Sequence, residues 1–345
     1  MVELLGKTLT ELQNVAAENG MPKFTARQMA QWMYRKQVRS IDEMTDISKL
    51  NREKLKQNYQ LGCSDPVEKA VSKDGTVKFL FQTNEGKFIE TVYIPEHDRA
   101  TLCVSSQVGC KMNCKFCATG KQGFNGNLTA GEILNQIVTV NTLMAEKGEL
   151  TNIVFMGQGE PMDNYDNVGK ALEILTSEYG FAWSPKRITV STVGLKKNLH
   201  RFLQDSNCHL AVSLHFPIHE QRMMYMPAEK QLPISELVDI LRQYDFSHQR
   251  RLSFEYIMFK GINDSSLFAK ELVRLLDGLD CRVNLIPFHR IPELDMEGTE
   301  PDRMAVFRDY LTKHGIYTTI RTSRGLDIEA ACGLLRAKYD VMVKG

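Results

Sequence analysis

Three cysteines lie close together in this chain, at a spacing that suits metal binding. They are Cys110, Cys114 and Cys117, which form a C-x3-C-x2-C motif within eight residues. Soft thiolate ligands select iron–sulfur clusters, zinc or copper(I). A structural zinc site is closed by four ligands, whereas a four-iron cluster bound by three cysteines leaves one iron open for a small molecule. The motif contains no fourth Cys or His, so it favours an open cluster over a zinc site completed by a distant residue.

A carboxylate in a glycine-containing segment is a second candidate binding feature. Glu160 lies in the segment 157–161, which reads Gly-Gln-Gly-Glu-Pro. Glycine allows the backbone to approach a ligand closely, and a carboxylate is a suitable partner for an ammonium group. Without other features, this segment is equally typical of an ordinary turn.

Two further cysteines, Cys103 and Cys332, lie outside the three-cysteine motif. A free cysteine is among the most buried residue types and usually behaves as a small hydrophobe. Either residue alone is therefore compatible with simple packing, and only its flanking sequence can indicate a chemical role.

The elements that must position these residues follow a repeating pattern of strand, loop and helix. Strand-like segments are found at 101–106, 152–156, 187–192, 209–215, 252–258, 282–287 and 316–322. The pattern predicts an α/β fold whose parallel sheet curls into a full or partial (β/α) barrel. An open doubly wound sheet is the alternative, but no glycine-rich dinucleotide motif follows any strand. In both folds the carboxyl ends of the strands carry the chemistry.

The first 97 residues have a different pattern. Three helices are predicted, over 8–19, 26–37 and 47–60, and Thr8 with Glu11 provides a capping box for the first. Three short β-rich segments follow, at 67–72, 76–83 and 87–94, separated by Asp-Gly and Glu-Gly turns. We therefore predict a helical accessory domain at 1–62, a three-stranded β-meander extension at 63–97 and a barrel at 98–345.

The composition is that of an ordinary globular protein. Of the 345 residues, 43% are hydrophobic and 25% are charged, and the formal net charge is +1. This balance excludes collagen-like, disordered and disulfide-stapled classes, and it neither predicts nor excludes nucleic-acid binding. No run approaches the ~18 apolar residues of a membrane span, and the N-terminus lacks signal-peptide features. We expect a cytoplasmic protein whose eight cysteines are reduced and serve packing, metal binding or catalysis.

A three-cysteine motif after the first strand of a βα barrel resembles that of the radical S-adenosylmethionine (SAM) superfamily. The resemblance implies that Cys110, Cys114 and Cys117 hold a [4Fe-4S] cluster whose open iron is chelated by SAM. It implies that Gly159 and Glu160 receive the SAM amino group. It further implies that an electron, from a donor such as flavodoxin or ferredoxin, cleaves SAM to a deoxyadenosyl radical.

Further segments narrow the resemblance to the radical-SAM RNA adenine methyltransferases. These segments are 90–95 (Glu-Thr-Val-Tyr-Ile-Pro), 103–110 (Cys-Val-Ser-Ser-Gln-Val-Gly-Cys), 191–192 (Ser-Thr), 213–215 (Ser-Leu-His) and 328–333 (Ile-Glu-Ala-Ala-Cys-Gly). An RlmN-type branch of this family acts on adenine C-2 and a Cfr-type branch acts on C-8. The segment 90–96 favours the C-2 branch, and the N-terminal helices resemble the family's accessory domain.

The resemblance implies a two-stage reaction, since adenine C-2 is neither acidic nor nucleophilic. Cys332 takes a methyl group from one SAM, and a radical from a second SAM removes hydrogen from that methyl. The resulting methylene adds to adenine and joins the protein to the RNA. Cys103 resolves this adduct and forms a disulfide with Cys332, and Glu90 is a candidate proton acceptor.

The resemblance also implies a set of SAM contacts: Ser191, Ser213, Leu214, His215 and His289. At His289 the chain departs from the family, which often has Asn there. A neutral imidazole can supply a donor or an acceptor to a ligand, not both as an amide does, so this contact differs from the family's.

We therefore expect a monomeric RNA adenine methyltransferase that makes 2-methyladenosine and has no membrane partner. The resemblance implies two substrates: an adenosine in the peptidyl-transferase centre of 23S rRNA and the adenosine 3′ of the anticodon in tRNA. One alternative is C-8 methylation of the same rRNA base, which confers antibiotic resistance. Another is a non-catalytic, metal-bearing RNA-binding protein, against which the Ala-Ala-Cys-Gly context of Cys332 argues.

Overall fold

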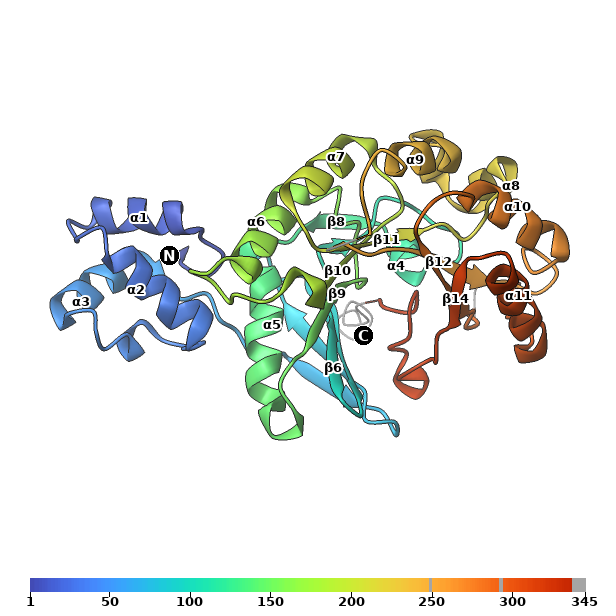
Figure 1. The fold of residues 1–345 in the computed structure, drawn as a ribbon. Coiled ribbons are helices and arrows are strands. Elements are labelled where there is room, and N and C mark those ends of the chain that lie inside the picture. Colours follow the sequence, from blue (N-terminus) through green and yellow to red (C-terminus); the bar gives the residue numbers. More distant parts are fainter. Residues whose placement is uncertain (248–249, 292–293, 337–345) are drawn as a thin grey trace.

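A ten-stranded sheet forms the centre of the protein (Figure 1), with strand order β14-β13-β12-β11-β10-β9-β6-β5-β4-β3. The computed structural model describes residues 1–345 except 248–249, 292–293 and 337–345. Seven neighbouring strands run parallel. They are β6 (Arg99–Cys103), β9 (Asn152–Phe155), β10 (Ile188–Thr192), β11 (His209–Ser213), β12 (Leu252–Met258), β13 (Arg282–Pro287) and β14 (Tyr317–Ile320). Since β14 and β3 form the two edges of the sheet, the predicted partial (β/α) barrel is confirmed.

Helices connect the parallel strands and cover the sheet. They are α5 (Ala130–Met144), α6 (Tyr165–Thr176), α7 (Lys196–Asp205), α8 (His219–Tyr225), α9 (Ile234–Leu241), α10 (Ser266–Leu276) and α11 (Pro301–Lys313). The helix α9 illustrates why these segments fold as they do. Its buried residues include Ile234, Leu237, Val238 and Leu241, a spacing that places apolar side chains on one helical face.

The predicted β-meander extends the barrel sheet. Its strands β3 (Glu68–Val71), β4 (Val77–Gln82) and β5 (Phe88–Glu96) are antiparallel. The last of them, β5, also pairs with the first barrel strand, β6. The meander and the barrel therefore share one continuous sheet.

The N-terminal helices form a separate group at one end of the molecule (blue in Figure 1). They are α1 (Leu9–Glu18), α2 (Thr25–Ala30), which continues into a π-helical turn at Gln31–Arg35, and α3 (Lys49–Asn58). The predicted capping box is present, because Thr8 N–H donates to Glu11 at 2.8 Å and Glu11 N–H donates to Thr8 Oγ1 at 3.3 Å. A two-residue strand pair, β1 (Val2–Glu3) with β2 (Tyr59–Gln60), joins the two ends of this module.

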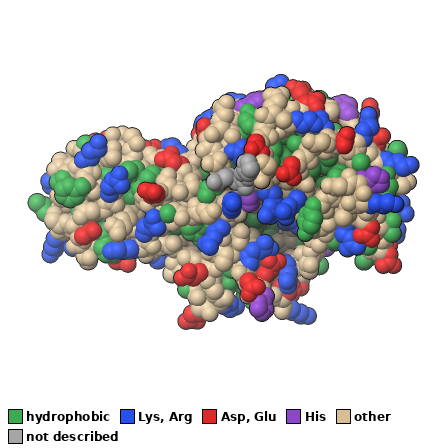
Figure 2. Space-filling model, viewed as in Figure 1, with side chains coloured by type: hydrophobic (Ala, Val, Ile, Leu, Met, Phe, Trp, Pro, Cys, Tyr) green, Lys and Arg blue, Asp and Glu red, His purple; other side chains and the backbone are tan. Residues whose placement is uncertain are grey.

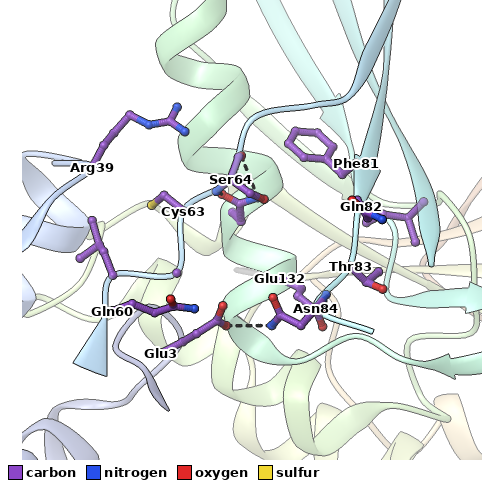
Figure 3. Close-up of a pocket in the computed structure, with 14 residues that line it drawn as sticks. Glu3, Arg39, Gln60, Cys63, Ser64, Phe81, Gln82, Thr83, Asn84 and Glu132 are labelled. Atoms are coloured by element: carbon purple, nitrogen blue, oxygen red, sulfur yellow. Dashed lines mark hydrogen bonds between the residues drawn. The ribbon is translucent and has the colours of Figure 1, made fainter. Parts of the chain in front are cut away.

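A polar cavity of about 300 Å³ lies where the accessory module meets the sheet and α5 (Figure 3). The Asn84 side chain donates to Glu3 at 3.1 Å, and the Asn84 N–H donates to Glu132 at 2.9 Å. Asn135 bonds the backbone and hydroxyl of Ser64. These contacts connect the module to the barrel through the base of α5.

None of the helices in the described ranges has the length and apolar character needed to cross a membrane.

Candidate active site

Short elements frame the three-cysteine motif. The strands β7 (Gln107–Gly109) and β8 (Phe124–Asn127) form a hairpin around it, and the helix α4 (Ala118–Gln122) follows its last cysteine. The backbone of Gly109 has φ +71°, and a Cβ there would collide with the Gly123 carbonyl. Only glycine therefore allows the chain to turn into the motif at this point.

The three thiols line one cavity of about 150 Å³ at the carboxyl ends of the strands. Burial raises the pKa of the Cys110 thiol to about 12 and that of Cys114 even further, and the neighbouring thiols add to both shifts. Three neighbouring cysteines become thiolates together only when a strong positive charge holds them. An iron–sulfur cluster provides that charge.

The arrangement of the thiols fits a cluster. Within the described part of the chain, no three His, Cys, Asp or Glu side chains converge on a point that would hold a single metal ion. A four-iron cluster makes a different demand, since each thiolate bonds its own iron and the sulfurs stay apart. Cys110, Cys114 and Cys117 on one cavity wall meet that demand.

Glu160 lies on the same cavity, beyond the end of β9, and is buried. Its carboxylate accepts from Thr192 Oγ1 at 2.7 Å, from Val193 N–H at 2.9 Å and from Met162 N–H at 3.0 Å. Burial raises its pKa to about 7, and the hydrogen bonds oppose that rise. A carboxylate has about four acceptor sites, so one site remains for a cationic group in the cavity.

The glycines beside Glu160 serve the protein's own packing as well as the cavity. A Cβ at Gly159, where φ is +102°, would lie 2.6 Å from Gln107 Cβ, and one at Gly157 would lie 2.7 Å from the Val104 carbonyl. The segment therefore packs tightly on the residues after β6. There the Gln107 side chain accepts from Glu160 N–H at 2.9 Å. The sequence interpretation, in which these glycines approach a ligand, missed this contact.

Three of the predicted SAM contacts line the cavity: Ser191, Ser213 and His215. Burial lowers the pKa of His215 to about 3, so its ring is neutral. Its Nδ1 accepts from Ile257 N–H at 3.1 Å, and the neutral ring therefore carries its proton on Nε2. This nitrogen is a fixed donor.

The other two predicted contacts, Leu214 and His289, are not among the described residues that line the cavity. The Leu214 side chain is in the core, and its backbone groups bond Glu255 at 3.1 Å and Arg222 at 3.0 Å. His289 Nε2 lies 2.6 Å from Ser323 Oγ. Their roles as SAM contacts remain predictions.

The structure brings the two isolated cysteines together. Cys103 is buried at the end of β6, and Cys332 is exposed on the wall of the cavity. Burial raises the pKa of Cys103 to about 12, and the nearby Cys332 raises it further. Both thiols are free.

Arg321 is a functional candidate that sequence reasoning missed. It pairs with the buried Glu255 at 3.3 Å. Its charge lowers the pKa of both Cys103 and Cys332, against the effect of burial. Nothing in the sequence distinguishes this arginine from an exposed one.

Glu90 is buried on β5, and its Oε1 lies 2.9 Å from the Lys78 ammonium group. Burial raises its pKa, while Lys78 acts in the opposite direction. It is not among the described residues that line the cavity, so its role as a proton acceptor remains a prediction. Gln158 accepts from Glu90 N–H at 2.9 Å and so links β5 to the segment that contains Glu160.

A fully buried arginine fixes the strand ends that carry the candidate contacts. Arg222, on α8, forms an ion pair with the equally buried Glu229. It also donates to the carbonyls of Val193 and Ser213 at 2.9 Å and of Leu214 at 3.0 Å. The carboxyl ends of β10 and β11 are therefore held by one side chain.

Comparisons with known proteins agree with this geometry. The family models of the ribosomal RNA large subunit methyltransferase N-terminal domain and of the radical SAM superfamily match residues 2–61 and 104–271, respectively. A probable dual-specificity RNA methyltransferase RlmN from Phocaeicola vulgatus is 62% identical, over 99% of this chain and 97% of the relative. A dual-specificity RNA methyltransferase RlmN from Solidesulfovibrio magneticus is 43% identical, over 99% and 98%.

A solved structure extends the comparison to three dimensions. The crystal structure of a radical SAM methyltransferase from Sphaerobacter thermophilus is 42% identical and matches with a TM-score of 0.92, over 98% of this chain and 100% of that one. The likeness includes both the accessory module and the barrel. The identity to the RlmN relatives over nearly the whole chain, with which this structure and the cysteine-lined cavity agree, shows that this chain belongs to the RlmN family of radical-SAM RNA methyltransferases.

Proposed function

We propose that this protein methylates C-2 of an adenosine in 23S rRNA and of the adenosine 3′ of the anticodon in tRNA, through a methylated Cys332. The observation that carries the proposal is the convergence of five cysteines on one site. Three of them, with Glu160, surround the cavity. The fourth, Cys332, lies on the wall of the same cavity. The fifth, Cys103, lies close enough to Cys332 for the charge of Cys332 to raise its pKa.

In this proposal Cys110, Cys114 and Cys117 hold the cluster. The free acceptor site of Glu160 receives the SAM ammonium group, and the Nε2–H of His215 donates to a SAM oxygen. The cluster and two SAM molecules supply a methyl group and a carbon radical when bound. The rest of the site must then present a sulfur atom and move a proton.

Cys332 suits the role of methyl carrier because it is the exposed thiol of the site. A thiolate is the nucleophile; desolvation in the site raises the pKa of Cys332, and the charge of Arg321 opposes that rise. Cys103, with its raised pKa, remains a protonated thiol at neutral pH. In the proposed cycle an acceptor such as Glu90 takes the thiol proton, and the resulting Cys103 thiolate removes the ring proton. The Cys103–Cys332 disulfide then forms as the bond between the Cys332 sulfur and the methylene carbon breaks, and that carbon takes up a proton to become the methyl group of the product.

The accessory module and the surface support an RNA substrate. Figure 2 shows Lys and Arg side chains gathered over the middle of the larger body and on the accessory module. Cationic side chains of this kind neutralise RNA phosphates. The target base must leave its stack to reach the cavity. We expect the protein to act as a monomer in the cytoplasm, with a flavodoxin- or ferredoxin-type electron donor.

The test is nucleoside mass spectrometry of 23S rRNA and tRNA from cells that lack the gene. Complementation with the wild type is expected to restore 2-methyladenosine, and Cys332→Ala is expected not to. The matched control is Cys281→Ala, a half-buried cysteine outside the cavity, which should restore the product. Formation of 8-methyladenosine would establish the C-8 alternative, and no methyladenosine from the wild type would favour a non-catalytic RNA-binding role.

A further inference from the structure

The segment that carries Cys332 has little regular structure of its own. Residues 325–335, here called the carrier segment (red in Figure 1), contain one short 3-10 turn, at Leu326–Ile328. A thiol that must meet two partners in turn needs a defined position, because small displacements of reacting groups cost large factors in rate. The position of Cys332 must therefore come from contacts with other elements.

One end of the carrier segment is fixed by the turn between β3 and β4. Asp74 Oδ2 accepts from Gly325 N–H at 2.9 Å. In the opposite direction, Asp327 accepts from Ser72 Oγ at 2.5 Å and from Lys73 N–H at 3.1 Å. Two carboxylates, one from each segment, therefore accept hydrogen bonds from the other segment, which is about 250 positions away in the sequence.

The close fit of this contact supports its specificity. Gly325 has φ +62°, and a Cβ there would lie 2.9 Å from Thr76 Cγ2 and 2.8 Å from Ala330 Cβ. Ala330 N–H donates to the Gly325 carbonyl at 2.9 Å, which closes the chain into a compact loop before Cys332. Ala330 also packs in one apolar cluster with Cys103.

The hydrogen bonds also hold the carboxylates ionised. Burial acts to raise the pKa of Asp74, but the donors at Gly325 and Thr76 keep it well below the usual range. The donors at Ser72 and Lys73 lower the pKa of Asp327. Charged acceptors make the stronger hydrogen bonds, so the contact persists across the neutral pH range.

The other end of the carrier segment is fixed to the element that follows the cluster motif. Ala118 N–H donates to the Gly333 carbonyl at 2.8 Å, and Thr119 Oγ1 donates to the Leu335 carbonyl at 2.7 Å. Cys332 therefore lies between two anchors. The anchor at α4 is inseparable from the cluster motif, whereas the anchor at the β3–β4 turn is remote from it.

We propose that the β3–β4 turn, through Ser72 and Asp74, is a positioning element that holds Cys332 at the cavity beside Cys103. The proposal rests on the proposed function of Cys332 as methyl carrier. Neither Ser72 nor Asp74 lines the cavity among the described residues, so they act through the carrier segment. This assigns a positioning role to the β3–β4 turn of the β-meander, in addition to the role proposed for Glu90 on β5.

The test compares four single variants of the full-length, cluster-loaded protein by hydrogen exchange and by turnover. Asp74→Ala removes the hydrogen bond to Gly325 N–H, and Ser72→Ala removes the hydroxyl hydrogen bond to Asp327. Ser72→Thr keeps the hydroxyl, and Asp98→Ala removes an exposed acid at the tip of the neighbouring β5–β6 hairpin. We expect roughly tenfold faster exchange of peptide 325–331 and a roughly tenfold lower kcat in the first two variants. Ser72→Thr and Asp98→Ala should match the wild type, and all four should keep the cluster absorbance.

Wild-type exchange of peptide 325–331 in Asp74→Ala and Ser72→Ala would overturn the proposal. Faster exchange with unchanged kcat would also overturn it, since Cys332 would then not need the turn. If the wild type itself makes no methyladenosine, the proposed function has failed. Hydrogen exchange of peptide 325–331 then tests by itself whether the turn holds the carrier segment. Faster exchange in both variants then supports the anchor, and unchanged exchange refutes it.

Discussion

At the scale of single residues, burial and charge act in opposite directions on the cysteines of this site. Burial raises the pKa of Cys103, Cys110 and Cys114. Two sources of positive charge oppose this effect. One is Arg321, which favours the thiolate forms of Cys103 and Cys332. The other is the iron cluster that the three-cysteine motif is suited to hold.

The cluster assignment is tested by replacing Cys110, Cys114 or Cys117 with Ala. Each variant should lose the brown chromophore and the cleavage of SAM, because a three-thiolate site has no spare ligand. Iron and sulfide analysis with a visible absorption spectrum measures the loss. Cys208→Ala, which replaces a buried cysteine at the opposite ends of the strands, should keep the full cluster. A complete four-iron cluster in any motif variant would contradict the assignment.

The effect of Arg321 on Cys332 is tested by the pH dependence of alkylation. Desolvation raises the pKa of Cys332, the charge of Arg321 acts to lower it, and the charge of Glu255 acts to raise it. Arg321→Gln should therefore move the midpoint of iodoacetamide labelling to higher pH, and Glu255→Gln should move it to lower pH. All samples carry Cys117→Ala, which is expected to lose the cluster and so to leave Cys332 unmethylated. Peptide mass spectrometry reads the labelling. Shifts of the same sign in both variants would show that this pair does not control the thiol.

At the scale of elements, the site is built where the parallel strands end. Ser191 and Ser213 lie at the carboxyl ends of β10 and β11, and Glu160 follows β9. The buried Arg222 holds two of these ends through carbonyls of both loops. The position of the candidate cofactor contacts therefore depends on one ion pair.

Removing one member of that pair should cost much stability. Arg222→Met leaves the buried carboxylate of Glu229 without its guanidinium partner and with only His219 Nδ1, 2.7 Å away, as a possible cation, and such losses cost about 3–5 kcal/mol. Urea denaturation measures the change in the free energy of unfolding. The double variant Arg222→Met with Glu229→Leu should recover part of the loss, because an apolar pair of similar size needs no counter-charge. A loss of under about 1 kcal/mol in the single variant would show that this buried pair contributes no more than an exposed ion pair does.

Long and periodic elements could be predicted from the sequence, and short ones could not. All seven parallel strands and the capping box at Thr8 were predicted. The strands β1 and β2 have two residues each, and β7 has three. Such segments contain no repeat from which a period can be recognised.

Some residues of the candidate site could likewise be predicted from the sequence, and others could not. The cysteine motif and Glu160 are close in sequence or follow predicted strands, so their spacing carried the information. The roles of Arg222 and Arg321 depend on contacts with residues from other strands. The local sequence does not distinguish a buried arginine from an exposed one, because burial is set by the tertiary fold.

At the scale of the whole molecule, the accessory module is docked on the barrel through close backbone contact. A Cβ at Gly131, in the first turn of α5, would lie 2.6 Å from the Leu5 carbonyl. Lys170 on α6 adds an ion pair with Glu11 at 2.5 Å, and Arg35 donates to the Glu178 carbonyl at 2.8 Å. The module is therefore held in one orientation relative to the cavity.

Gly131→Ala should disturb this docking and the delivery of RNA. We expect faster proteolysis between residues 61 and 68 and a roughly 10- to 100-fold lower rate of RNA methylation, with the cluster retained. The control is Gly169→Ala on α6, whose Cβ would meet only an ordinary contact at 3.6 Å and should be tolerated. Equal proteolysis and methylation rates in the two variants would argue against a role for the docking contact.

The central claim is that Cys332 forms a covalent bond to adenine, which Cys103 then resolves. Cys103→Ala keeps the cluster motif and Cys332, so it should still methylate Cys332 and add to the base, but not release the RNA. The measurement is mass spectrometry of peptides and nucleosides from Cys103→Ala purified from RNA-rich cells. We predict a nuclease-sensitive protein–RNA species that survives denaturant and contains Cys332 joined through one carbon to adenine C-2. Unmodified Cys332 together with normal turnover in Cys103→Ala would contradict the account.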